Sequence, residues 1–227
     1  MVKLHTPRRR FYTPYEVALH SSPDDCWVSF LGGVYDLSSL IKENPGALSE
    51  PLIQMAGEDI SHWFDLETKD VKRHVDPITN MECAYTPMGR FIHVPPTEPT
   101  NDWSTVVTKP WWADQTFRIG SLTAKLRQVR TKNVLTGQEE TLEVPEEETI
   151  VEIRERYLMH NWHAKSYTWK AIRKVQGKWQ FDELDMNLTL DENGILDEVP
   201  EFEGLNVPTD YYVPVLHVYW NDDLTVA

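Results

Sequence analysis

Cysteine, long apolar stretches and basic residues near the C-terminal end are all scarce in this sequence. Two cysteines among 227 residues are too few to crosslink a secreted scaffold, so a reducing cytosol is the expected location. No apolar stretch approaches the roughly 20 residues that a membrane-spanning helix needs. The first residues also lack the apolar centre of a signal peptide. These absences predict an intracellular protein that is not embedded in a membrane.

The charge is strongly acidic and unevenly distributed. Lysine and arginine total 22 against 36 aspartate and glutamate, which gives a net charge of −14. No lysine or arginine follows Lys178. Such a surface repels phosphate backbones and anionic lipids, so neither nucleic acid nor a membrane is expected as a partner. Hydrophobic residues make up 41% of the chain, which is typical of a folded globular protein.

A proline- and tryptophan-rich segment, residues 95–115, divides the sequence into two expected domains, 1–94 and 116–227. Proline at this density favours extended chain and disfavours both helices and sheet ladders. Exposed tryptophans are costly in water, so those of this region are expected to pack against one or both domains. They are Trp103, Trp111 and Trp112.

The pattern of the first domain predicts short helices around a hairpin. Thr13–Glu16 is a capping box that begins a helix through about His20. Cys26–Phe30 and Val34–Leu37 read as two strands joined by a glycine turn. Pro51–Gly57 is a short apolar helix ended by glycine, and Glu58–Phe64 predicts another.

The second domain predicts a hairpin, a helix and further strands. Leu122–Arg127 and Glu140–Val144 are expected to pair, and Pro145 opens an acidic turn that suits a helix start. Ser166–Lys170 and Val213–Trp220 read as later strands. This is the order of a β-grasp, and the segment Met186–Ile195 resembles the late turn of ubiquitin-like domains. The predicted fold class is therefore α+β, and the acidic stretch 182–203 is expected to be either a solvated loop or ordered by a partner.

Three pieces of the first domain carry a resemblance to a known family. They are the run Trp27–Leu40, the motif Asn44-Pro45-Gly46 and the segment Ala56–Ile60. In this order they resemble the cytochrome b5 domain family. The resemblance implies a haem b group held by two axial histidines, the first from a His-Pro-Gly-Gly motif and the second from a later helix.

The resemblance places Asn44 where the family has its first axial histidine, and an amide is a poor iron ligand beside imidazole. It implies His74, after a short insertion at Leu66–Asp70, as the surviving axial ligand of the haem iron. His62 is the second candidate, because it lies within the matching segment but just before the usual ligand position. A histidine beside Trp63 and Phe64 also suits a packing or capping role.

The second axial position of the haem iron has several candidates. It is empty, or it holds water or one of four side chains, Met55, Met88, Cys83 and His93. A purely structural alternative stands beside haem binding. In this alternative, apolar side chains fill the haem pocket of the family, among them Leu48, Leu52 and Ile53. The first domain then keeps the fold of the family without binding haem.

The combination of both domains resembles two-domain cytochrome b5-like proteins of motile cilia. It implies a protein of the cytoplasm and cytoskeleton, docked on the cilium or flagellum axoneme near radial spoke proteins, in which haem tunes beating with redox state. The sequence offers no nucleophile with a base and no phosphate-binding glycine loop, so no enzyme activity is expected.

Three alternatives stay open. A soluble electron carrier would dock through its acidic surface on a redox partner. A steroid-receptor type of b5-like domain would bind haem through a tyrosine, Tyr35 or Tyr85. A ubiquitin-pathway adaptor would work without haem.

Overall fold

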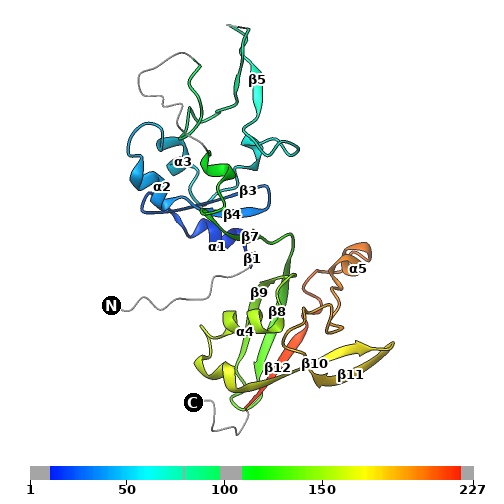
Figure 1. Ribbon diagram of the computed structural model, residues 1–227. Helices are drawn as coiled ribbons and strands as arrows, with labels where there is room; N and C mark the ends of the chain where they lie inside the picture. Colours follow the sequence, from blue (N-terminus) through cyan, green and yellow to red (C-terminus); the bar gives the residue numbers. More distant parts are fainter. Residues whose placement is uncertain (1–10, 79, 98–108, 221–227) are drawn as a thin grey trace. The chain divides into compact units, whose positions relative to one another are not determined.

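The computed structural model describes residues 11–78, 80–97 and 109–220, and the chain divides into two compact units, Met1–Leu122 and Thr123–Ala227 (Figure 1). The division lies later than the boundary expected at residue 116. The reason is that strand β7 (Arg118–Leu122) pairs with β4 (Gly33–Asp36) of the first unit. The segment 95–115, expected as a linker, thus falls within the first unit.

The first unit combines short helices with one five-stranded sheet and a separate two-stranded hairpin. Its remaining elements, in chain order, are β1 (Phe11–Tyr12), α1 (Pro14–Ala18), β2 (Ser21–Ser22), β3 (Asp25–Phe30), α2 (Ser38–Glu43), α3 (Glu50–Gln54), the 3₁₀ helix η1 (Ser61–Trp63), β5 (Arg73–Val75), β6 (Glu82–Ala84) and the 3₁₀ helix η2 (Trp111–Ala113). The sheet has the order β1-β7-β4-β3-β2, so β7 lies in its interior.

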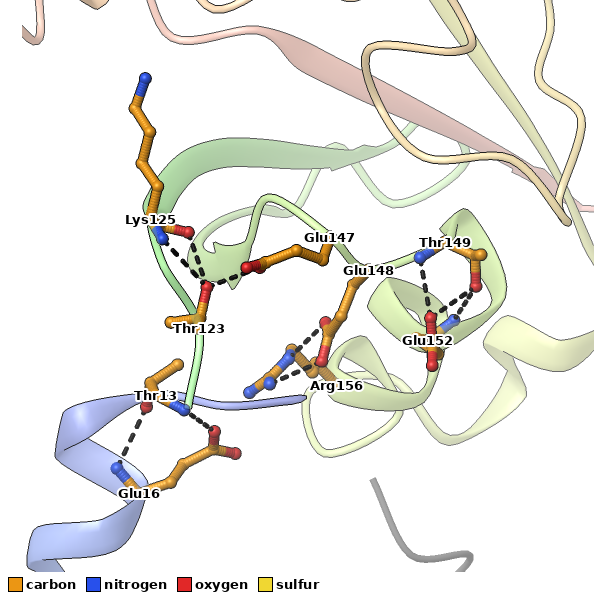
Figure 2. Close-up of polar contacts among 9 residues, drawn as sticks. All are labelled: Thr13, Glu16, Thr123, Lys125, Glu147, Glu148, Thr149, Glu152 and Arg156. Carbon is orange, nitrogen blue, oxygen red and sulfur yellow. Dashed lines mark hydrogen bonds and ion pairs between the residues drawn. The ribbon is translucent and has the colours of Figure 1, made fainter. Parts of the chain in front are cut away.

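Local sequence signals account for the first elements of this unit. The hydroxyl of Thr13 accepts the Glu16 N–H at 3.0 Å, and the Glu16 carboxylate accepts the Thr13 N–H at 2.9 Å, which is the predicted capping box (Figure 2). The predicted hairpin is confirmed as β3 and β4, which are antiparallel. Leu31 and Gly32 carry the turn at φ 47° and 74°, in the left-handed region that two-residue hairpin loops require.

The helices after the hairpin are shorter than the sequence predicts. The helix expected over Pro51–Gly57 ends at Gln54, and the one expected over Glu58–Phe64 is reduced to the single turn η1. Gly57 has φ +86°, and a Cβ there would lie 3.1 Å from the Cα of Ala18. Glycine is therefore required at this position by both the backbone angle and the close approach of α1.

Aromatic side chains fill the core of the first unit. Trp63 and Trp111 are fully buried, and Trp112 is nearly so. Trp111 packs edge-on against Trp112 and Phe30, with ring centroids 5.6 Å apart in both pairs. The indole N–H of Trp112 donates to the Asp70 carboxylate at 2.9 Å. The expected packing of the segment's tryptophans is thus confirmed for two of them, and Trp103 lies outside the described residues.

The second unit is a β-grasp (Figure 1). Its sheet has the order β11-β10-β12-β8-β9, and the last strand, β12, runs parallel to the first, β8, in the middle of the sheet. The elements are β8 (Leu126–Asn133), β9 (Glu139–Pro145), α4 (Ile150–Tyr157), the 3₁₀ helix η3 (Trp162–Ser166), β10 (Tyr167–Val175), β11 (Lys178–Glu183), α5 (Val199–Gly204) and β12 (Val215–Trp220). The predicted hairpin, helix and later strands are confirmed, with β8 beginning four residues after the expected start.

Helix α4 is held in place by a capping box, an ion pair and a buried apolar face. Thr149 and Glu152 form a capping box (Figure 2). The carboxylate of Glu148, just before it, accepts two hydrogen bonds of 2.7 Å from the guanidinium of Arg156, and both side chains are nearly buried. Ile150 and Ile153, three residues apart and therefore on one face of the helix, are fully buried.

The acidic stretch 182–203 is packed within the second unit rather than being a solvated loop. Leu190 is fully buried and Ile195 nearly so. The side chain of Asn193 accepts the Asp185 N–H and donates to the Thr189 carbonyl, both at 2.9 Å. One buried amide therefore holds this turn closed through hydrogen bonds within the unit.

Candidate functional site

The first unit has an open groove of ≈ 750 Å³ beside the loop that joins α2 to α3. This loop carries the Asn44-Pro45-Gly46 motif, and the facing wall is formed by residues 88–90. The groove is lined by Ile41, Pro45, Gly46, Ala47, Leu48, Ser49, Glu50, Pro51, Ile53, Met88, Gly89 and Arg90. Its position and its largely apolar lining make it the candidate ligand site of this unit.

Asn44 does not line the groove. It is the C-terminal cap of α2, and its side-chain amide donates to the Leu40 carbonyl at 2.9 Å. The same carbonyl also accepts the backbone N–H of Asn44 at 3.1 Å, so backbone and side chain of Asn44 close the end of α2 together. At the position where the resemblance expects an iron ligand, the chain therefore has a helix cap.

The groove does not fit a haem with two imidazole ligands. No histidine, cysteine or tyrosine is among its lining residues. Met88, whose side chain is partly exposed, supplies its one sulfur donor, a thioether. Leu48 and Ile53 line the groove, while Leu52 is fully buried beneath it. Of the three side chains expected to fill the haem pocket, Leu48 and Ile53 thus line an open groove, and Leu52 belongs to the hydrophobic core.

The two predicted axial histidines lie elsewhere. His74 is exposed on β5, directly opposite Cys83 on β6. The sulfur of Cys83 lies 3.6 Å from Nε2 and 3.8 Å from Nδ1 of His74. His62 is exposed on η1 and meets the edge of the Trp63 ring. The assignment of either histidine to haem stays a prediction, and the structure brings His74 together with Cys83 instead of with the groove.

The other donors that the sequence offered are mostly structural. Nδ1 of His93 accepts the backbone N–H of Trp111 at 3.0 Å, and burial lowers the pKa of this histidine. Tyr35 is buried and stacks on Phe30, and burial raises the pKa of its hydroxyl. Met55 is half-buried against the core.

The outward face of the β-grasp sheet is a second candidate surface, which the sequence analysis did not identify. Ile172 on β10 and Phe181 on β11 are paired across the strands and are 49% and 45% exposed. Trp179, 59% exposed, stands opposite Lys174 on the same face. We call Ile172, Trp179 and Phe181 the aromatic face.

Aromatic contacts and cations border the aromatic face. Phe181 meets the His217 ring edge-on at 5.2 Å, and Lys170 lies over the Tyr219 ring at 5.4 Å. On β10, the residues that point to the opposite face, Trp169 and Ala171, are almost fully buried. The sequence does contain a signal for this face. Polar and aromatic residues alternate along Lys178–Glu183, after the Gln176-Gly177 turn, and this alternation predicts a strand with one apolar side.

Two features are absent from residues 11–78, 80–97 and 109–220, the part of the chain that the structure describes. No helix there combines the length and apolar character that crossing a bilayer demands. Nor do those residues bring together three or more histidine, cysteine, aspartate or glutamate side chains in a metal-binding arrangement.

Comparison with known proteins gives a family and several relatives. The sequence model of the cytochrome b5-like heme/steroid binding domain matches residues 13–75. Cytochrome b5 domain-containing protein 1 of Homo sapiens is 49% identical over 96% of this chain and 92% of its own length. The protein of the same name from Xenopus tropicalis is 50% identical over 96% of this chain and 97% of its own. Among solved structures, the C-terminal ubiquitin-like domain of mouse tubulin-specific chaperone e covers 43% of this chain and 88% of its own, at 14% identity and a TM-score of 0.27.

Proposed function

The chain belongs to the cytochrome b5 domain-containing protein 1 family, and we propose that it is a non-enzymatic assembly subunit of the axoneme of motile cilia, docked near the radial spokes. The resemblance to two-domain proteins of motile cilia implies this role. It places the protein in the cytoplasm and on the ciliary cytoskeleton, with axonemal proteins as partners.

The observation that supports this role best is the aromatic face. Ile172, Trp179 and Phe181 are each about half exposed, on a sheet whose other side carries the buried core residues Trp169 and Ala171 of β10. Contiguous exposed aromatic and aliphatic side chains mark protein-binding surfaces, because large rings contribute most of the energy of an interface. A subunit that docks through its second unit would use this face.

The groove supports assembly over electron transfer. Fast reversible reduction at a b5-type centre relies on two strong axial ligands, and the groove contains no imidazole. Where a b5 carrier would present an axial histidine, Asn44 caps a helix.

Co-sedimentation with demembranated axonemes tests the docking role. We expect the variant Trp179→Ser/Phe181→Ser to lose binding about tenfold or more, because a central interface aromatic is typically worth about 2 kcal/mol or more. The matched control is Leu135→Ser, which removes a side chain that is 67% exposed in the β8–β9 turn of the same unit. Wild-type binding by the double variant, with circular dichroism showing both proteins folded, would contradict the proposal.

Haem binding is a second candidate function, which the family match over residues 13–75 favours. Absorption titration with haemin, oxidised and then reduced with dithionite, tests it. If haem occupies the groove, Met88→Ala should weaken binding while His74→Ala and His62→Ala leave it unchanged. A Soret shift lost in His74→Ala would instead assign the haem to the β5–β6 hairpin. If the Soret band shows no saturable shift in either oxidation state, the chain does not bind haem, and the assembly role stands alone.

A further inference from the structure

The β5–β6 hairpin holds a thiol and an imidazole side by side. His74 and Cys83 are directly opposite across the two strands, and the sulfur approaches both ring nitrogens, at 3.6 and 3.8 Å. The thiol also lies 3.7 Å from the His74 carbonyl oxygen. The register of a two-stranded ladder fixes this pairing, since opposite residues share a face.

This pair is not suited to iron in a porphyrin or to a closed metal site. A sulfur and a nitrogen 3.6 Å apart leave no room for a macrocycle between them. Within the described residues, no third histidine, cysteine or carboxylate joins them to complete a metal-binding set. A partly exposed thiol in contact with a base is instead the arrangement of a reactive cysteine.

We propose that Cys83 is a site of reversible thiol–disulfide exchange with glutathione disulfide, in which His74 takes up the thiol proton. The imidazole accepts the proton from Sγ, and the resulting thiolate attacks one sulfur of the disulfide. A bond forms between Cys83 Sγ and that sulfur while the original S–S bond breaks. The departing glutathione thiolate then takes the proton back from the imidazolium. The balance is one protein thiol and one glutathione disulfide converted to one mixed disulfide and one glutathione.

The second cysteine of the chain, Cys26, serves as an internal control because its thiol is expected to be unreactive. Cys26 is fully buried in the first unit's core, and burial together with nearby Asp36 and Asp25 raises the pKa of its thiol to about 12. Because the thiolate is the attacking species, Cys26 in the folded chain should not react. Selectivity for Cys83 therefore follows from the fold.

The surroundings of the pair suit an anionic tripeptide. The ladder continues beyond the strands, with the Tyr85 N–H donating to the Lys72 carbonyl at 2.7 Å. By the alternation of the strand, Lys72 is on the same face as His74, two residues along, and its side chain is exposed. Its ammonium would attract the carboxylates of glutathione, while Asp76, two residues in the other direction, is the anion of this face.

The test incubates the folded full-length chain with glutathione disulfide at pH 7 and follows adducts by intact mass and peptide mapping. We expect one adduct, on Cys83, that dithiothreitol removes. In His74→Gln the rate should fall about tenfold, as loss of a positioned base generally costs at least that much. Added imidazole should restore much of it. Tyr85→Phe, which keeps the ring beside His74, is the matched control and should react at the wild-type rate.

The chain unfolded in urea gives the intrinsic rate of both cysteines. The proposal is overturned if Cys83 in the folded chain reacts no faster than in urea. Equal rates for wild type and His74→Gln would also overturn it, as would equal modification of Cys26. Imidazole rescue separates a chemical role of His74 from a loss of hairpin structure, since a disordered hairpin would not respond selectively to added imidazole.

Discussion

Replacing Trp111 by alanine tests whether the proline- and tryptophan-rich segment is part of the first unit's core. Its side chain is fully buried, and its ring packs edge-on against Phe30, Phe64 and Trp112. A free linker would tolerate the change. A core residue would not, because the small side chain leaves a cavity that rigid aromatic neighbours cannot fill.

The size of the effect follows from the buried area. A tryptophan buries about 150–250 Å², which at about 25 cal/mol per Å² corresponds to about 4–6 kcal/mol as an upper limit. Core substitutions of tryptophan by alanine cost about 3–5 kcal/mol, and we expect Trp111→Ala to fall in that range. Trp111→Phe should cost less than about 2 kcal/mol. It retains most of the ring and removes a buried indole N–H that has no hydrogen-bond partner among the described residues.

Hydrogen exchange followed by mass spectrometry resolves the two units separately. Amides of β3 and β4 report the first unit, and amides of β8 and β10 report the second. At about 1.4 kcal/mol per factor of ten, protection of β3 and β4 should fall at least about 100-fold in Trp111→Ala. Protection of β8 and β10 should not change. A loss below about tenfold in β3 and β4, or an equal loss in both units, would refute the reasoning.

Three further predictions concern polar contacts. Glu148→Gln should destabilise the second unit by about 1.5–3 kcal/mol in urea unfolding, since it removes the charge from a buried carboxylate that accepts two hydrogen bonds from the Arg156 guanidinium; a loss below about 1 kcal/mol would contradict this. Thr149→Ala should cost about 1 kcal/mol through loss of the cap of α4, and Thr149→Ser should restore most of it in the same assay. Because burial lowers the pKa of His93 from 6.5, protonation favours the unfolded chain, so the stability that its neutral ring provides is present above about pH 6.5 and is lost as the pH falls through the folded-state pKa. In His93→Asn this part of the pH dependence should disappear from unfolding curves measured between pH 7 and pH 5, and an unchanged slope would rule out the assignment.

Elements that depend on near neighbours in sequence were predictable. The capping box at Thr13 and Glu16 and the β3–β4 hairpin each rest on residues within one turn or one loop of each other. The order of the β-grasp strands also followed, because a hairpin, a helix and a closing strand leave few ways to cover one sheet. The edge strand β11 was missed, although Gly177 and the alternation after it were visible.

What the sequence could not reveal depends on pairing between distant segments. Strand β7 joins β4 more than 80 residues earlier in the chain, and no local pattern at Arg118–Leu122 distinguishes this from a strand of the second unit. The contact of His74 with Cys83 depends on the register of a hairpin that the sequence analysis did not predict. The role of His93 depends on the backbone of Trp111, which lies 18 residues away.

The interior position of β7 has a consequence for biosynthesis. This strand separates β1 from β4 in the sheet, so the nascent first unit lacks an inner strand until residue 122 has been translated. At about 5–20 residues per second, the interval between synthesis of residues 94 and 122 lasts roughly 1–6 s. During that interval the edge of β4 and the pocket for Trp111 remain open to other chains. We therefore expect chaperone engagement to be concentrated on ribosomes within this window, and to end once β7 closes the sheet.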